Sequence, residues 1–130
     1  MSARNPDSKP NADRRAADRY EVIWSVDCQT PDTFLYAAIT NISELGIFVQ
    51  TTEPLPVGTR IRLRFAPPGF DPFSLQGLVQ WVNPVRRSGD NPNPGMGIRF
   101  VEISSNDRER LIDVIKTIAY LRDSVRPPSN

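Results

Sequence analysis

Short stretches in which apolar and polar residues alternate dominate the middle of the chain. In the stretch 60–65, Ile61, Leu63 and Phe65 alternate with three arginines, which is the pattern of a half-buried β-strand. Five further stretches are rich in β-branched and aromatic residues, namely 21–28, 34–41, 46–51, 73–82 and 95–101. Clusters of Pro, Gly, Asn and Asp separate the six stretches, so we expect an antiparallel sandwich or barrel.

After Ile103 the period of the apolar residues changes from two to the helical value. The stripe consists of Leu111, Val114, Ile115, Ile118 and Leu121. Ser104 offers an N-cap side chain, and Asp107 suits the positive end of a helix dipole. We therefore predict one amphipathic helix over 106–122. Packing of the stripe on the sheet is the simplest use of this helix, and docking of a partner protein is the alternative.

The ends of the chain differ in composition from the middle. Residues 1–13 and 123–130 contain almost nothing to bury, so we expect two flexible tails around one domain over 14–122. The charged, proline-rich stretch 83–94 is expected to be a flexible surface loop.

The charge balance argues against a polyanionic partner. The chain has 16 basic and 15 acidic side chains, and almost all of the basic ones are arginines. A net charge of +1 produces no global field that would attract a nucleic acid polymer or an anionic membrane. We interpret the outward row Arg60, Arg62 and Arg64 as a solvated face rather than as a nucleic-acid track.

Histidine is absent and Cys28 is the one cysteine. The chain therefore has no internal disulfide, no imidazole base and no Cys/His zinc site. Ser43 has no histidine partner that could make it a nucleophile. These absences predict a protein that is not an enzyme. No signal-peptide core and no stretch of about 18 apolar residues occurs, so we expect a cytoplasmic protein without membrane insertion.

Three arginines, Arg14, Arg15 and Arg19, lie just before the first predicted strand. A guanidinium group can bind a phosphate or the O6/N7 edge of guanine through two parallel hydrogen bonds, and its flat face can stack on a base. An extended arm would bring Arg15 and Arg19 to one ligand and become ordered on binding. We expect Asp18 to support Arg19 weakly.

A second polar cluster, Asn41, Ser43 and Gly46, lies where the second predicted strand ends. By alternation, Ala37, Ile39 and Asn41 share one face of that strand, and Asn41 and Ser43 project from the same side. Gly46 has two interpretations, a positive φ or a close approach of backbone or ligand. Taken alone, this spacing is also that of an ordinary hairpin.

The order and spacing of the two clusters resemble the PilZ domain family, bacterial receptors for cyclic di-GMP. That family has the motifs RxxxR and [D/N]xSxxG, which correspond here to Arg15–Arg19 and Asn41–Gly46. The segment Gly97–Phe100 and the helix after it resemble the end of the family's domain. The resemblance covers about residues 14–122. It implies a mainly β fold, a six-stranded antiparallel β-barrel with a C-terminal α-helix, in agreement with the strand pattern.

The resemblance also implies a ligand, cyclic di-GMP, and no other cofactor. Arg15 and Arg19 would bind phosphate and guanine edges, and Arg14 would add charge or stacking. The residues implied on the opposite side are Asn41, Ser43 and Gly46, and Arg99 is a further candidate. Asn41 stands where aspartate is frequent, which keeps the acceptor and loses the charge. Trp24 and Trp81 are interpreted as core or rim residues outside the site.

The implied function is that of a receptor and adaptor. Ligand would order the arginine arm, and the changed surface would signal to an unidentified protein effector in motility, surface or polysaccharide regulation. A ligand-independent PilZ-like interaction module is the first alternative. A small barrel for single-stranded nucleic acid is the second, and the charge balance and the lack of an exposed aromatic pattern disfavour it.

Overall fold

The computed structural model describes residues 18–85 and 93–124. The strands are β1 (Tyr20–Gln29), β2 (Phe34–Ile42), β3 (Gly46–Gln50), β4 (Arg60–Phe65), β5 (Phe73–Asn83) and β6 (Gly95–Val101), followed by the helix α2 (Ser105–Ser124). All six predicted strands and the predicted helix are confirmed, with bounds that differ by two residues at most. We expect the two tails and the loop 83–94 to be flexible, but most of these residues lie outside the described ranges.

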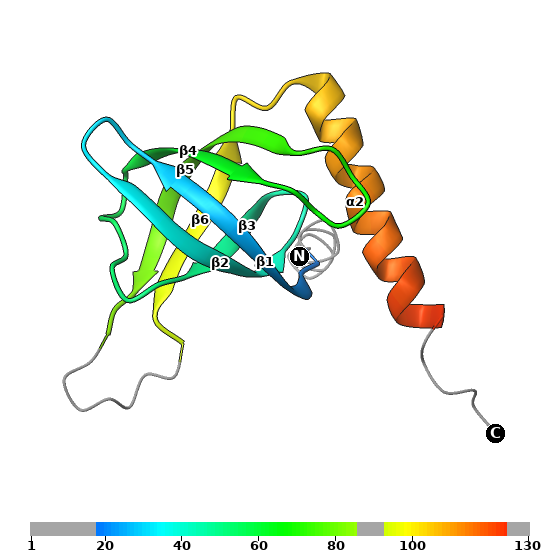
Figure 1. The fold of residues 1–130 in the computed structure, drawn as a ribbon, viewed down its shortest axis with the longest axis horizontal. Coiled ribbons are helices and arrows are strands. Elements are labelled where there is room, and N and C mark those ends of the chain that lie inside the picture. Colours follow the sequence, from blue (N-terminus) through cyan, green and yellow to red (C-terminus); the bar gives the residue numbers. More distant parts are fainter. Residues whose placement is uncertain (1–17, 86–92, 125–130) are drawn as a thin grey trace, which may run out of the picture.

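The six strands form a closed antiparallel barrel in the order β1-β2-β3-β6-β5-β4, as Figure 1 shows. Closure gives every strand a neighbour on both sides, although β1 pairs with β4 only over Asp27–Gln29. In this order β4 and β3 are separated by two strands in either direction. They therefore lie on opposite sides of the barrel.

Register shifts in three strand pairs change which side chains point inward, and two of them involve β2. The pairing of β1 with β2 shifts between Glu21 and Trp24, and that of β2 with β3 shifts between Ile39 and Asn41. After the second bulge Ile42, and not Asn41, enters the core, where it is fully buried. The prediction that Asn41 shares the face of Ile39 is therefore wrong, because a bulge inserts one residue and reverses the alternation.

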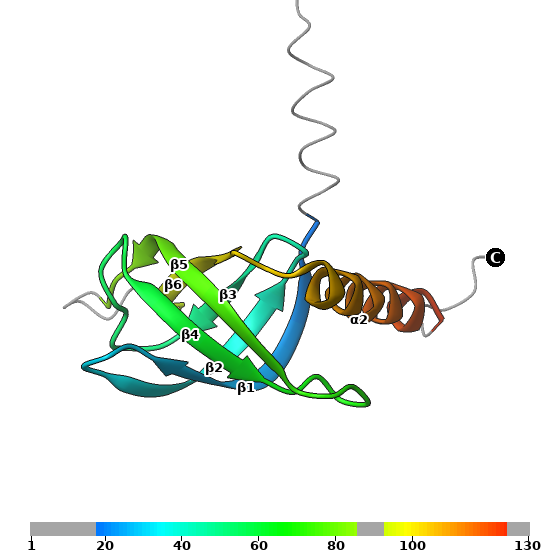
Figure 2. The ribbon, with the colours of Figure 1, turned by 90° about the horizontal axis from the view of Figure 1, so that it is seen from above.

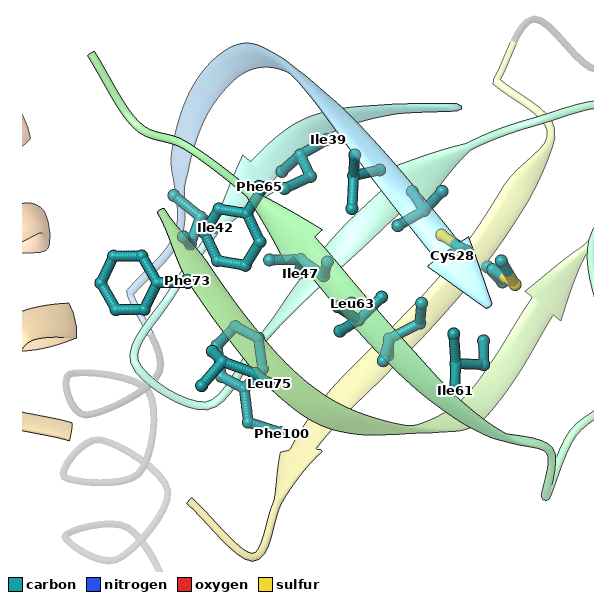
Figure 3. Close-up of a cluster of buried hydrophobic side chains, with 14 of the residues drawn as sticks. Cys28, Ile39, Ile42, Ile47, Ile61, Leu63, Phe65, Phe73, Leu75 and Phe100 are labelled. Atoms are coloured by element: carbon teal, nitrogen blue, oxygen red, sulfur yellow. The ribbon is translucent and has the colours of Figure 1, made fainter. Parts of the chain in front are cut away.

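The barrel interior is filled by aliphatic and aromatic side chains. Figure 3 shows Phe65 and Phe73 side by side at one end of the interior and Ile61 and Cys28 at the other. The Phe65 and Phe73 rings are stacked with centroids 5.3 Å apart, and Trp24 extends this stack at 6.3 Å from Phe65. The aromatic end of the core is therefore built from the start of β1, the end of β4 and the start of β5.

Helix α2 covers this aromatic end. Leu111 and Val114 are buried in the same core, which confirms that the first part of the apolar stripe packs on the barrel, whereas Leu121 is 55% exposed. The Arg110 guanidinium lies 4.0 Å from the centre of the Phe73 ring and donates a hydrogen bond of 2.7 Å to the Asp71 carbonyl. The two contacts attach the first half of α2 to the start of β5 and to the β4–β5 loop.

The second half of α2 extends beyond the strands, as seen in Figure 2. An apolar groove of about 430 Å³ remains between this half, the start of β1 and the β4–β5 loop. The Arg122 guanidinium lies over the Tyr20 ring at 5.7 Å and donates a hydrogen bond to the Glu21 carbonyl. The end of the helix is thus attached to the first residues of β1.

We expect the Cys28 thiol to be unreactive in the folded protein. Burial, reinforced by the neighbouring Asp27 carboxylate, raises the pKa of Cys28 to about 12, whereas a free thiol has a pKa of about 8.5. The unfolded chain therefore loses this proton first, and the free energy of unfolding falls as the pH rises from about 8.5 towards 12.

Labelling with Ellman's reagent at pH 8 should be slow for the native chain and fast in denaturant. The fall in stability above pH 8.5 should be smaller in Cys28→Ala, which has no thiol to titrate. Native labelling at the rate of the denatured chain would contradict the burial of this group.

Candidate functional site

The turn between β2 and β3 is organised by the hydroxyl group of Ser43. This side chain is fully buried. Its Oγ accepts hydrogen bonds from the backbone N–H groups of Leu45 at 3.1 Å and Gly46 at 3.3 Å. The Ser43 N–H in turn donates to the Gly46 carbonyl at 2.9 Å. The serine thus closes the turn by a side-chain-to-backbone pattern, and its position after the end of β2 means that strand alternation does not place it.

Arg19 joins this turn to the start of β1. Its Nε donates a hydrogen bond of 2.8 Å to Asn41 Oδ1, and its Nη1 donates one of 3.3 Å to Ser43 Oγ. Partial burial lowers the pKa of the Arg19 guanidinium by desolvation. No ion pair joins Arg19 to Asp18 in the described part of the chain, so the support expected from Asp18 is absent. The two predicted clusters therefore meet at Arg19 itself.

Gly46 allows β3 and β6 to approach each other. It lies opposite Arg99 in the strand pairing, and a Cβ atom at this position would collide with the carbonyl oxygen of Ile98. The positive-φ glycines among the described residues are Gly58 and Gly69. Of the two interpretations of Gly46, the structure therefore supports the close backbone approach.

A two-ring platform lies beside Arg99 on the outside of the barrel. Phe48 and Trp81 both pair with Gly97, on either side of it, and their rings stack with centroids 5.3 Å apart. A Cβ atom at Gly97 would collide with the Trp81 indole. Glycine at this position thus lets the two rings meet across β6, while Trp81 stays 50% exposed.

These side chains line one cleft of about 180 Å³, formed by Arg19, Leu45, Gly46, Gln80, Trp81, Gly97, Ile98 and Arg99. Two guanidinium groups and an exposed indole face therefore share a single depression. The structure brings Arg19, Gly46 and Arg99 to the cleft itself, and Asn41 and Ser43 contact it through Arg19. Arg14 and Arg15 lie outside the described residues.

Trp81 is the residue that sequence reasoning left out of the site. The interpretation of Trp81 as a rim residue agrees with its partial exposure. It did not place the indole in the cleft. The available signal was the pair Gly95 and Gly97 in a predicted strand, since glycine inside a strand marks the close approach of another group. For Gly97, that group is the indole.

The cleft has the properties of a binding site for a planar anion. Guanidinium groups supply fixed cationic forks, and an exposed indole supplies an apolar stacking face. In the part of the chain that the structure describes, no group of three or more His, Cys, Asp or Glu side chains could hold a metal ion. Within the same residues, no helix is long and apolar enough to cross a membrane.

A family model described as the PilZ domain matches residues 13–117. No curated protein matches the chain. Several solved structures share its fold. The inhibitor of motility MotI/DgrA from Bacillus subtilis is 18% identical with a TM-score of 0.68, over 88% of this chain and 54% of that one.

Two structures of YcgR from Escherichia coli are also similar. Its PilZ domain with c-di-GMP is 15% identical with a TM-score of 0.69, over 85% of this chain and 95% of that one. YcgR in complex with c-di-GMP is 19% identical with a TM-score of 0.65, over 87% and 51%. The chain thus spans about half the length of MotI/DgrA and of the longer YcgR structure, and at these identities the likeness is one of fold.

We predict that Gly97→Ala destabilises the protein by displacing Trp81. The added Cβ meets the indole, and overpacking of this kind costs about 1–3 kcal/mol. Urea denaturation of Gly97→Ala, Trp81→Ala and the double variant measures the coupling between the two positions. In the Trp81→Ala background the alanine has room, so the same change at residue 97 should cost much less. An equal cost in both backgrounds would show that the indole does not determine this glycine.

Proposed function

This chain belongs to the PilZ domain family, and we propose that it is a receptor that binds cyclic di-GMP in the cleft between Arg19, Trp81 and Arg99. The observation that carries the proposal is the clamp on Arg19. Asn41 and Ser43 hold its guanidinium group at the rim of a cleft that also contains Arg99. Arg19 of the first motif thus contacts the second motif, which begins 22 positions later in the sequence.

The charges in the cleft suit the phosphates and the guanine edges of this ligand. The Arg19 guanidinium is already partly desolvated, so less water remains to screen an anion placed next to it. Arg99 is exposed and makes no ion pair with any residue of 18–85 or 93–124. Each guanidinium can form paired hydrogen bonds with a phosphate or with guanine O6 and N7.

The exposed face of Trp81 suits a guanine base. Stacking of a base on an aromatic side chain contributes about 1–3 kcal/mol. Phe48, which is buried, supports the other side of the platform, so the indole is oriented before ligand arrives. In this proposal one guanine stacks on Trp81 while Arg19 and Arg99 bind its edge or the adjoining phosphate.

The size of the cleft calls for further residues. A volume of about 180 Å³ is smaller than the roughly 300–1,000 Å³ of typical small-molecule sites. Arg14 and Arg15 lie a few residues before β1 in the sequence, and in this proposal they cover the ligand from the open side. Ordering of these residues has an entropic cost, which favours a moderate affinity.

The output of such a receptor is a changed surface that a protein effector reads, and motility is the process named for one structure of the same fold. A ligand-independent interaction module remains the second candidate. It is favoured by the fact that Asn41 and Ser43 already satisfy two donors of Arg19 without any ligand. The two candidates differ in whether cyclic di-GMP binds at all.

We expect isothermal titration calorimetry to detect cyclic di-GMP binding by the full chain and to show a large loss for Arg19→Ala. A hydrogen bond to a charged group contributes about 1.5–3 kcal/mol, so each of Arg19→Ala and Arg99→Ala should bind about 10- to 100-fold more weakly. Arg15→Ala tests the arm in the same way.

Arg108→Ala is the matched control, because Arg108 is an exposed arginine on α2 that does not line the cleft. Its affinity should equal that of the unmodified chain. If the unmodified chain gives no binding, the receptor proposal is wrong and the ligand-independent module is retained. Loss of binding in Arg108→Ala would show a non-specific charge effect.

We expect ligand to change the fluorescence of Trp81 and not that of Trp24. The chain contains two tryptophans, and Trp24 is partly buried against the core. Trp24→Phe leaves Trp81 as the one indole, and cyclic di-GMP should quench its emission by stacking. Trp81→Phe leaves Trp24, whose emission should not change. Binding by calorimetry without quenching in Trp24→Phe would place the base elsewhere.

A further inference from the structure

A second charged surface lies on the outside of β4 and its neighbours. Two cross-strand rows run from β2 through β1 to β4: Tyr36, Asp27 and Arg64, and then Phe34, Gln29 and Arg62. Side chains that pair in this way project from the same face of a sheet. Because adjacent strands are about 4.8 Å apart, each aromatic residue lies about 10 Å from the arginine of its row. We call this surface the β4 face.

The β4 face carries two arginines without a partner. Arg60 forms an ion pair of 3.3 Å with Glu102. Arg62 and Arg64 are exposed, and within the described ranges neither forms a side-chain hydrogen bond or an ion pair. Asp27 is the cross-strand neighbour of Arg64, yet no ion pair joins them. Two guanidinium groups of the face are therefore available to an external anion.

An aromatic pair lies on the same face, across β1 from these arginines. Phe34 and Tyr36 are 55% and 74% exposed, and their rings lie 4.9 Å apart in a tilted arrangement. Both lie at the start of β2, and their exposed rings are not part of the core. Exposed aromatic side chains next to arginine are the composition that protein–protein interfaces concentrate. The expectation that the chain lacks an exposed aromatic pattern is therefore wrong for this face.

The surface is also hollowed. A groove of about 420 Å³ is lined by Gln29, Thr30, Pro31, Arg60, Arg62 and Gln76. None of these residues lines the cleft of Arg19 and Arg99. β4 lies across the barrel from β3, which carries Gly46. The β4 face is thus separate from the proposed nucleotide site.

The number of available charges argues for a protein as the occupant. Two unpaired arginines neutralise about two phosphates, whereas nucleic-acid binders of useful affinity make about 6–10 such contacts. On an anionic membrane each basic side chain contributes about 1 kcal/mol, so two arginines contribute too little free energy for stable membrane binding. In a protein interface, by contrast, a few arginine and aromatic residues in a groove supply most of the affinity.

We propose that the β4 face is a docking surface for an acidic segment of a protein partner. Carboxylates of the segment pair with Arg62 and Arg64, and an aromatic or aliphatic side chain of the segment packs on Phe34 and Tyr36. The segment lies in the groove beside Arg62. This inference does not depend on cyclic di-GMP binding, since it uses none of the residues of that site.

The test is selection of binding peptides from a random phage-displayed library on the full chain. The selected peptides should be enriched in Asp and Glu together with aromatic or aliphatic residues. Titrated into the isotope-labelled chain, they should shift the amide NMR signals of β4 and of the β1–β2 hairpin. Affinity should fall at least tenfold in the variant that combines R62E and R64E, and several-fold in Phe34→Ala.

Arg108→Glu is the control for the type of substitution, because it makes one Arg-to-Glu change, half the charge change of the double variant, at an exposed arginine of α2; it should leave peptide affinity unchanged. Circular dichroism verifies that each variant is folded. The proposal is overturned if the selected peptides are neutral, if they bind the double variant equally well, or if they map to the apolar groove beside α2. Tighter binding of a single-stranded oligonucleotide than of the peptides, or self-association through the β4 face, would likewise overturn it.

Discussion

A single buried hydroxyl group connects the end of β2, the start of β3 and the entry to β1. Ser43 Oγ accepts from the N–H groups of Leu45 and Gly46, which fixes the turn into β3, and from Arg19, which fixes the entry to β1. The bond from the Gly46 N–H to this hydroxyl is buried, so without it that N–H would be left without a partner at a cost of about 1–3 kcal/mol. The turn, the arginine and the start of the barrel are thus held by one atom.

The second constraint is the absence of side chains at two glycines on neighbouring strands. Gly46 lets the β6 backbone approach, and Gly97 leaves room for the indole of Trp81. Together they create a depression between an arginine and an aromatic ring on a surface that would otherwise be covered by side chains. A receptor for a flat, anionic nucleotide needs this combination of a stacking face and fixed cations. The same barrel carries a different combination on the β4 face, with free arginines beside an exposed aromatic pair, which suits a protein segment.

Much of the fold was predictable because its signals are local. The alternation in 60–65 and the helical stripe of α2 each lie within one element. The strand order is not local in this sense, because β3 pairs with β6 and β4 closes the barrel against β1. The side on which Asn41 points was not predictable, because the bulge after Ile39 arises from the pairing of two strands. Bulges of this kind therefore mark the limit of reasoning from alternation.

By itself, the sequence determined the type of fold, the absence of histidine chemistry and the identity of the polar residues that surround the site, because composition, spacing and period are properties of the chain alone. Only the tertiary structure decided that Arg19 binds Asn41 and Ser43, that Gly46 serves a close approach, and that Trp81 belongs to the cleft. These contacts join residues more than 20 positions apart or lie across strand pairs. Their geometry depends on strand register, which no single segment specifies.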